Sequence, residues 1–291
     1  VDEMRTRLSV LELDSVLDAN YIAECLCDHR FSPFPTLGTT ERPDVAASRL
    51  LEGRCALVVD GSPVVLTAPH LLQECFQSND DYYISFLRTN VSRVLRTLGF
   101  LCSVTIPAVY TALLLYHREL VPARLLFAVT AAQRGVPLPV GWEVLLLLIV
   151  LEVLREAGAR TPGAMGQTMS IVGGLVLGQA AVDARFVSAP MVIIIAFSGV
   201  TALIVPKLRT ATLLLRFFLL VCAALLGLYG VLFGGCLILA HLCRLSSFGV
   251  PYLTNVLAAE KHSRRDVLLR FPWFAMKPEH RFLAGWRGVR R

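Results

Sequence analysis

Long uncharged stretches alternate with short charged ones in the second half of the chain. Residues 97–116, 163–182, 187–206 and 217–240 contain no charged side chain. About 20 apolar residues are enough for a helix to cross a hydrocarbon core of about 30 Å. We therefore predict an α-helical multi-pass membrane protein with about four full spans. Pro107 lies in the middle of the first span and predicts a kink, because its missing N–H leaves a carbonyl for a neighbour or water to satisfy.

The span 163–182 differs from the others because it is rich in glycine, hydroxyl and amide groups. At 100° per residue, one narrow stripe collects small or polar side chains, namely Gln167, Ser170, Gly174, Gly178 and Ala181. Small residues let helices approach closely inside a membrane, so the stripe predicts helix packing. If copies of the helix surround an axis, the same stripe would line a pore, with Gln167 and Ser170 facing water or ions. The sequence leaves both interpretations open.

Two acidic residues fall in the apolar stretch between the first and second spans. Glu143 and Glu152 are nine positions apart and therefore lie on opposite faces of a helix. Residues 120–132 are too short to cross, so we expect 119–161 to form a re-entrant or interfacial helical hairpin, with Arg155 as a charge partner for Glu152. Alternatively, one of the acids lines a cation pathway, since intramembrane carboxylates are costly and usually functional.

The last predicted span, 217–240, carries a second set of small residues. Gly227, Gly230 and Gly234 would give it a face for close helix packing.

Residues 1–92 lack such long uncharged stretches and predict a small, partial α/β cytosolic domain. The clearest signal is Asp60-Gly61 between two apolar runs, 54–59 and 62–67, which is typical of a β-hairpin with a type I′ turn. Asp60 is then a turn residue and not a catalytic acid.

Charge supports a division of the chain into three parts. Residues 1–92 hold 14 acidic and 7 basic side chains, whereas the remaining residues hold 8 and 21. Ten of the basic residues and three acidic ones fall in 244–291, which places this tail in the cytoplasm by the positive-inside rule. We expect a partial cytosolic domain (1–92), a membrane domain (93–243) and a basic cytosolic tail (244–291). One observation opposes this topology, because Lys207, Arg209 and Arg216 would then lie outside.

Several classes of function find no support in the sequence. The chain lacks HExxH, GxSxG and phosphate-loop motifs, so we expect no enzymatic activity. The eight cysteines show no paired ligand spacing, and we expect no metal or cofactor. Nothing in the basic tail points to nucleic acid.

Several segments resemble, in order, those of the GerA family of spore germination proteins. They are Ser32-Pro-Phe-Pro35, Thr40-Glu-Arg-Pro-Asp44, Leu51-Glu-Gly-Arg54, Val59-Asp-Gly-Ser-Pro63, Phe76-Gln-Ser78, Asp81-Tyr-Tyr83, Leu154-Arg-Glu-Ala-Gly158, Gly166-Gln-Thr-Met-Ser-Ile-Val-Gly173, Gly178-Gln-Ala-Ala181 and Ser247-Phe-Gly-Val-Pro-Tyr252.

The resemblance implies an A-type subunit of a nutrient-germinant receptor in the spore inner membrane. Such subunits are thought to assemble with B- and C-type subunits and to oligomerise, as a pentamer, into a ligand-gated ion channel. Family members carry a further N-terminal cytosolic region, so the resemblance implies that this chain is N-terminally truncated. Two alternatives stay open: an ion- or solute-coupled transporter with Glu143 and Glu152 as carriers, and a related A-type paralogue associated with dipicolinate release.

Overall fold

The computed structural model describes residues 2–12, 14–160, 174, 176–254 and 269–272. Its chain forms two compact units. Unit 1 combines residues 1–97 with 239–291, and unit 2 consists of residues 98–238. The predicted cytosolic domain and the basic tail therefore share one unit.

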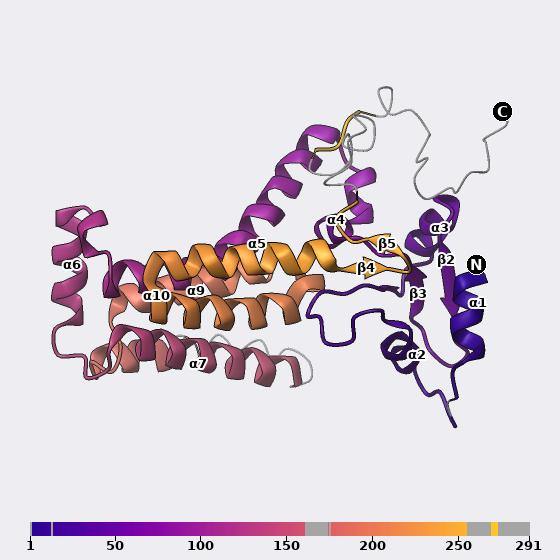
Figure 1. The fold of residues 1–291 in the computed structure, drawn as a ribbon. Coiled ribbons are helices and arrows are strands. Elements are labelled where there is room, and N and C mark those ends of the chain that lie inside the picture. Colours follow the sequence, from indigo (N-terminus) through magenta and orange to yellow (C-terminus); the bar gives the residue numbers. More distant parts are fainter. Residues whose placement is uncertain (1, 13, 161–173, 175, 255–268, 273–291) are drawn as a thin grey trace. The chain divides into compact units, whose positions relative to one another are not determined.

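Unit 1 is built on a small antiparallel sheet with helices packed on it (Figure 1). The strands are β1 (Gly38–Thr40), β2 (Cys55–Val58) and β3 (Val65–Ala68), with β3 in the middle. The helices are α1 (Asp2–Ser9), α2 (Ala19–Leu26), α3 (Pro43–Leu51), α4 (Leu72–Phe76) and the 3₁₀ turn η1 (Asn79–Tyr82). A second, two-stranded sheet pairs β4 (Ser246–Ser247) with β5 (Val250–Pro251). The core of the unit contains Met4, Ala19, Ala23, Leu26, Leu37, Leu66 and Ala68.

The hairpin at Asp60-Gly61 forms, but its turn differs from the prediction. Val58 pairs with Val65, so the loop is six residues long and not two. Ser62 N donates to Val59 O, and Gly61 alone of the two central residues has a positive φ, of 81°. A type I′ turn needs positive φ at both positions, so that part of the prediction is wrong.

A buried polar cluster joins α4 to the segment that follows α10. Glu74, 1% exposed, accepts hydrogen bonds from Arg54 Nη1 at 2.5 Å and from His70 Nδ1 at 3.0 Å. The other imidazole nitrogen lies 3.5 Å from Cys75 Sγ, which in turn lies 3.8 Å from the Tyr252 hydroxyl. Burial disfavours the imidazolium, but the Glu74 carboxylate outweighs burial and raises the pKa of His70 to about 9. Burial likewise disfavours ionised Glu74, yet its cationic neighbours keep the pKa of this carboxyl below its usual range.

The elements that the structure describes in unit 2 are helices. They are most of α5 (Phe86–Leu115), η2 (Arg118–Leu120), α6 (Ala123–Gln133), α7 (Val140–Arg160), α9 (Ala189–Ala202), η3 (Pro206–Leu208) and most of α10 (Arg209–Arg244). By length and composition α5 and the stretch Pro206–Arg244 are candidate membrane spans among the described residues, while α9 is apolar but shorter.

α10 is not the single crossing that the uncharged run predicted. Gly227 has a non-helical backbone, with φ 62° and ψ −141°. A Cβ on Gly230 would lie 2.0 Å from Cys222 O, and one on Gly234 would lie 2.7 Å from Leu219 Cδ2. Residues 15 apart in a straight helix would be about 22 Å apart, so the helix folds back at Gly227 into two antiparallel arms (Figure 1).

The helices of unit 2 run between two ends. At one end, which we call the Tyr116 end, Tyr116 Oη donates to Ala224 O at 2.7 Å, and Gly141 lies against Leu115 and Ala224. At the other, the Gly99 end, Gly99 lies against Ile204. α5, α7, α9 and both arms of α10 run from one end to the other (Figure 1). α7 has 21 residues. Whether residues 119–161 form a re-entrant or interfacial hairpin in a membrane stays a prediction.

Candidate functional site

Buried charged and hydroxyl side chains of unit 2 gather at the two ends of α9. This helix has 14 residues and is about 21 Å long, which is shorter than the hydrocarbon core. Its unpaired backbone N–H and C=O groups would therefore lie at membrane depth, where each unsatisfied group is costly. Charged side chains from α7 and α10 bond Ser188 N at the start of α9 and the carbonyls of Ser198 and Gly199 near its end.

Glu143 of α7 holds the first turn of α9. Its Oε1 accepts hydrogen bonds from Ser188 N at 2.5 Å and from Ser188 Oγ at 2.7 Å. Both residues are 1% exposed, and Ser188 is the N-cap of α9. A carboxylate at this place also faces the positive end of the helix dipole. Both the charge-assisted hydrogen bonds and the dipole therefore stabilise it.

Two arginines hold the last turn of α9. Arg155 of α7 donates to Gly199 O at 3.0 Å, and Arg216 of α10 donates to Ser198 O at 3.2 Å. Both carbonyls lie at the negative end of the helix dipole, where cations are stabilised. Glu152 Oε1 lies 3.2 Å from Arg155 Nη1 and 3.5 Å from Arg216 Nη1, so one carboxylate serves two guanidinium groups.

Pro107, inside α5, connects this helix to the same cluster. Pro107 has no N–H, so the carbonyl four residues earlier, Ser103 O, loses its helical donor. This oxygen accepts hydrogen bonds from Ser198 Oγ at 2.7 Å and from Arg216 Nε at 3.1 Å. The prediction that a neighbour satisfies the freed carbonyl is confirmed. Arg216 of α10, whose side chain is 1% exposed, therefore contacts α5, α7 and α9.

We call these seven residues the α9 clamp: Ser103, Glu143, Glu152, Arg155, Ser188, Ser198 and Arg216. The clamp fixes α9 to α7 at both ends, and the cluster of Val144, Leu148, Met191 and Ile195 fills the space between the ends. The arrangement can hold a short helix rigidly inside the membrane.

The small-residue stripe falls only in part on described residues. Gln167 and Ser170 lie outside them. Gly174 has nothing within 4 Å of the place where a Cβ would be, Gly178 lies against Val192, and Ala181 is half-buried. Whether the stripe packs or lines a pore stays a prediction.

The three glycines of α10 occupy two different kinds of place. Gly230 and Gly234 lie between the two arms, where any side chain would collide. Gly227 forms the turn itself, against Tyr116 and His117. Nothing in the sequence distinguishes these three glycines.

Arg155 was expected as a partner of Glu152, and the ion pair between them is present. The sequence reasoning missed Arg216 and the serines of the clamp. One signal could have found Ser103, because the freed carbonyl lies four residues before Pro107. Groups of three or more His, Cys, Asp or Glu side chains that could hold a metal ion are absent from the residues that the structure describes.

Among the described residues, two stretches are apolar and long enough to cross a bilayer, which is consistent with a membrane protein. In one of them, buried polar groups bond the carbonyl that Pro107 frees. The family model of the Bacillus/Clostridium GerA spore germination protein matches residues 1–282. The chain therefore belongs to the GerA family.

Named relatives agree with this family. The chain is 43% identical over 275 residues to the spore germination protein KA of Bacillus subtilis, covering 94% of this chain and 51% of that protein. It is 41% identical over 278 residues to the uncharacterized membrane protein YfkQ of the same species, covering 95% and 54%. Spore germination protein A1 of B. subtilis is 36% identical over 274 residues, covering 94% and 57%.

The chain spans about half the length of these curated relatives. No solved structure matches it.

Proposed function

We propose that the chain is the membrane-embedded part of an A-type subunit of a nutrient-germinant receptor, and that this subunit forms a ligand-gated ion channel in the spore inner membrane. The observation that carries the proposal is the match to spore germination proteins along almost the whole chain, with a unit of apolar helices inside it. The subunit would act without enzymatic activity or a cofactor, together with B- and C-type subunits, as a homo-oligomer that is a pentamer.

The folded-back α10 supports a cytosolic location for both chain ends of unit 2. The second arm of α10 returns the chain toward the Gly99 end, where α5 begins. Lys207 and Arg209 lie at this end as well, and Arg216 is buried in the clamp. The three basic residues that opposed a cytosolic tail therefore no longer oppose it by the positive-inside rule.

The ion pathway is proposed to run along the stripe of Gln167 and Ser170. Glu143 and Glu152 are already engaged, the first by Ser188 and the second by two arginines. A carboxylate held by two cations is a poor ligand for a third, which argues against the coupled-transporter alternative with these acids as carriers. The clamp would instead supply a rigid frame around the moving part of the channel.

The test is nutrient-dependent conductance. The chain would be reconstituted with its B- and C-type partners in planar bilayers, and monovalent cation current would be recorded before and after addition of nutrient. Sustained current that persists at zero net substrate gradient supports a channel. Current that requires a solute gradient and reverses with it supports a transporter, and the absence of current in an assembled complex refutes both.

A further inference from the structure

The strongest unexplained surface lies at the Tyr116 end of unit 2, around α6. This helix has 11 residues and is about 16 Å long, so it cannot cross the bilayer. Leu126 and Val129 pack against the core of unit 2. Leu125, 59% exposed, and Phe127, 74% exposed, lie on the two sides of this packed face.

Four arginines lie on α6 or on the connections beside it. They are Arg118, Arg124, Arg134 and Arg185, and all four are exposed. Among the described residues, ion pairs involve none of them, although Glu119 and Asp183 are close in sequence. Exposed cations without carboxylate partners, beside exposed apolar side chains, form a surface complementary to anionic groups above a hydrocarbon boundary.

Arg185 gives a second, independent reason to assign a role to this charge. It lies just after the helix of residues 176–183, with φ 57°, a left-handed conformation in which glycine is the usual residue. Its guanidinium reaches Gly135, where a Cβ would lie 3.2 Å from Nη1. An arginine in a strained backbone position, lying over a glycine beside α6, is best explained by a use for its side chain.

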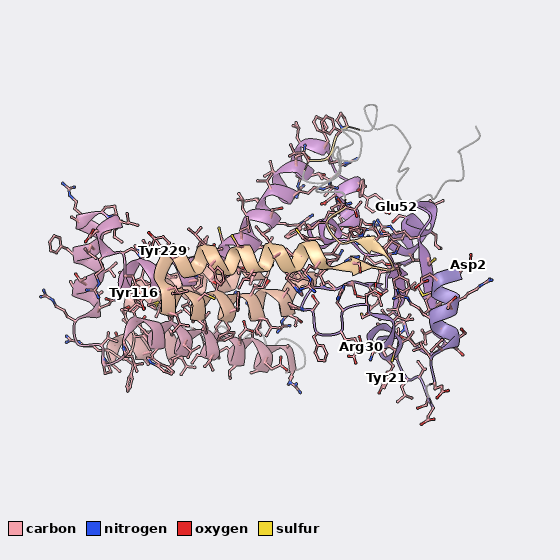
Figure 2. All side chains as sticks on the ribbon, in the orientation of Figure 1. Asp2, Tyr21, Arg30, Glu52, Tyr116 and Tyr229 are labelled. Carbon is pink, nitrogen blue, oxygen red and sulfur yellow. The ribbon has the colours of Figure 1, made fainter. Side chains whose placement is uncertain are left out.

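Exposed aromatic rings mark the same end. Tyr116 is 54% exposed, Tyr229 74% and Trp142 64%. Figure 2 shows Tyr116 and Tyr229 together at this end, and the ring of Tyr229 lies edge-on to His117 at 6.0 Å. Such amphipathic rings are typical of the boundary between headgroups and acyl chains.

We propose that α6 lies in the membrane interface and that its arginines bind the phosphate groups of anionic phospholipids. Leu125 and Phe127 of α6 enter the acyl boundary, while Arg124 at its start and Arg134 just after its end reach the headgroups. This interaction goes beyond channel function, because it needs only that unit 2 lies in a bilayer.

Trp142 provides a local reporter for the test. Trp273 and Trp286, which lie outside the described residues, are changed to Phe so that Trp142 is the single tryptophan. The full chain is then reconstituted in vesicles that contain phosphatidylcholine and phosphatidylglycerol, with one or the other lipid brominated. The ratio of quenching by the two brominated lipids reports the local enrichment of the anionic lipid around Trp142.

In the parent chain we expect stronger quenching by brominated phosphatidylglycerol than by brominated phosphatidylcholine. In Arg124→Gln/Arg134→Gln this preference should fall by up to about fivefold for each arginine removed, which corresponds to about 1 kcal/mol per cation near an anionic surface. The charge-conserving variant Arg124→Lys/Arg134→Lys should keep most of the preference for phosphatidylglycerol. The matched control, Arg160→Gln/Arg209→Gln, removes the same charge from the Gly99 end and should leave the ratio at Trp142 unchanged.

Three results would overturn the proposal. Equal quenching by both lipids in the parent chain would show that the arginines do not select anionic lipid. Absence of quenching by either lipid would show that protein or water, and not lipid, covers this end. Loss of the preference on addition of inorganic phosphate would assign the arginines to a soluble anion.

Discussion

Removing the carboxylate of Glu152 should be the most damaging single change in the α9 clamp. Glu152→Gln leaves Arg155 and Arg216 adjacent and without a counter-charge, because Glu152 Oε1 lies 3.2 and 3.5 Å from their nitrogens. Breaking a buried ion pair on one side costs about 3–5 kcal/mol. The same change should loosen the last turn of α9, since both arginines also hold its carbonyls.

Arg216→Met should cost less, about 1–3 kcal/mol. In that variant Glu152 keeps Arg155, and Ser103 O keeps the hydroxyl of Ser198. The double variant Glu152→Gln/Arg216→Met should be more stable than Glu152→Gln alone, because it removes one of the two uncompensated cations.

The free energy of unfolding would be measured by titrating the full chain in mixed micelles with a denaturing detergent. Glu156→Gln is the control, because Glu156 lies on the same helix and pairs with Arg160 at the surface, where ion pairs contribute about 0.5 kcal/mol. If Glu152→Gln destabilises the chain no more than Glu156→Gln does, or if the double variant is the least stable, the described clamp does not hold α9.

Three further changes test other parts of the structure. Gly230→Ala should destabilise unit 2 by about 1–3 kcal/mol, because its Cβ would collide with Cys222 O. Gly235→Ala, with open space around it, should be neutral or stabilising in the same detergent titration. Equal effects of the two substitutions would contradict the folded-back α10. Glu143→Gln should speed amide hydrogen exchange in the first turn of α9 and not in its last turn; uniform exchange along α9 would argue against a local cap. Because the pKa of His70 is raised in the folded chain, protonated His70 stabilises unit 1 by roughly 3 kcal/mol at most; this contribution is complete below the unfolded-state pKa of 6.5 and is lost as pH rises through about 9. Hydrogen exchange of residues 65–76 at pH 6 to 10, corrected for chemical exchange, should show this loss in the parent chain. An identical profile in His70→Asn would refute the assignment.

The sequence predicted those features that depend on one local signal. The uncharged run with Pro107 predicted both the first span and a satisfied carbonyl, because a missing N–H has the same consequence in any helix. The hairpin followed from Asp60-Gly61, although the loop length did not, since pairing begins only at Val58 and Val65.

Features that depend on distant contacts could not be predicted. Gly227 looks like Gly230 and Gly234 in the sequence, and only packing against Tyr116 and His117 reveals it as a turn. Arg216 looked like a topological signal because a charge beside a span usually marks a membrane side. Its partners Ser103, Glu152 and Ser198 are 113, 64 and 18 residues away, so their meeting is a property of the fold.

The central claim is that this chain forms part of a nutrient-gated ion channel whose path follows the stripe of Ser170. The most direct measurement is nutrient-evoked cation current of a Ser170→Cys variant, in complex with its B- and C-type partners, exposed to a charged water-soluble thiol reagent. The account predicts block of the current that develops only while nutrient is present, with no block in the parent chain. A variant that assembles, conducts and keeps its full current after exposure in the open state would contradict the account.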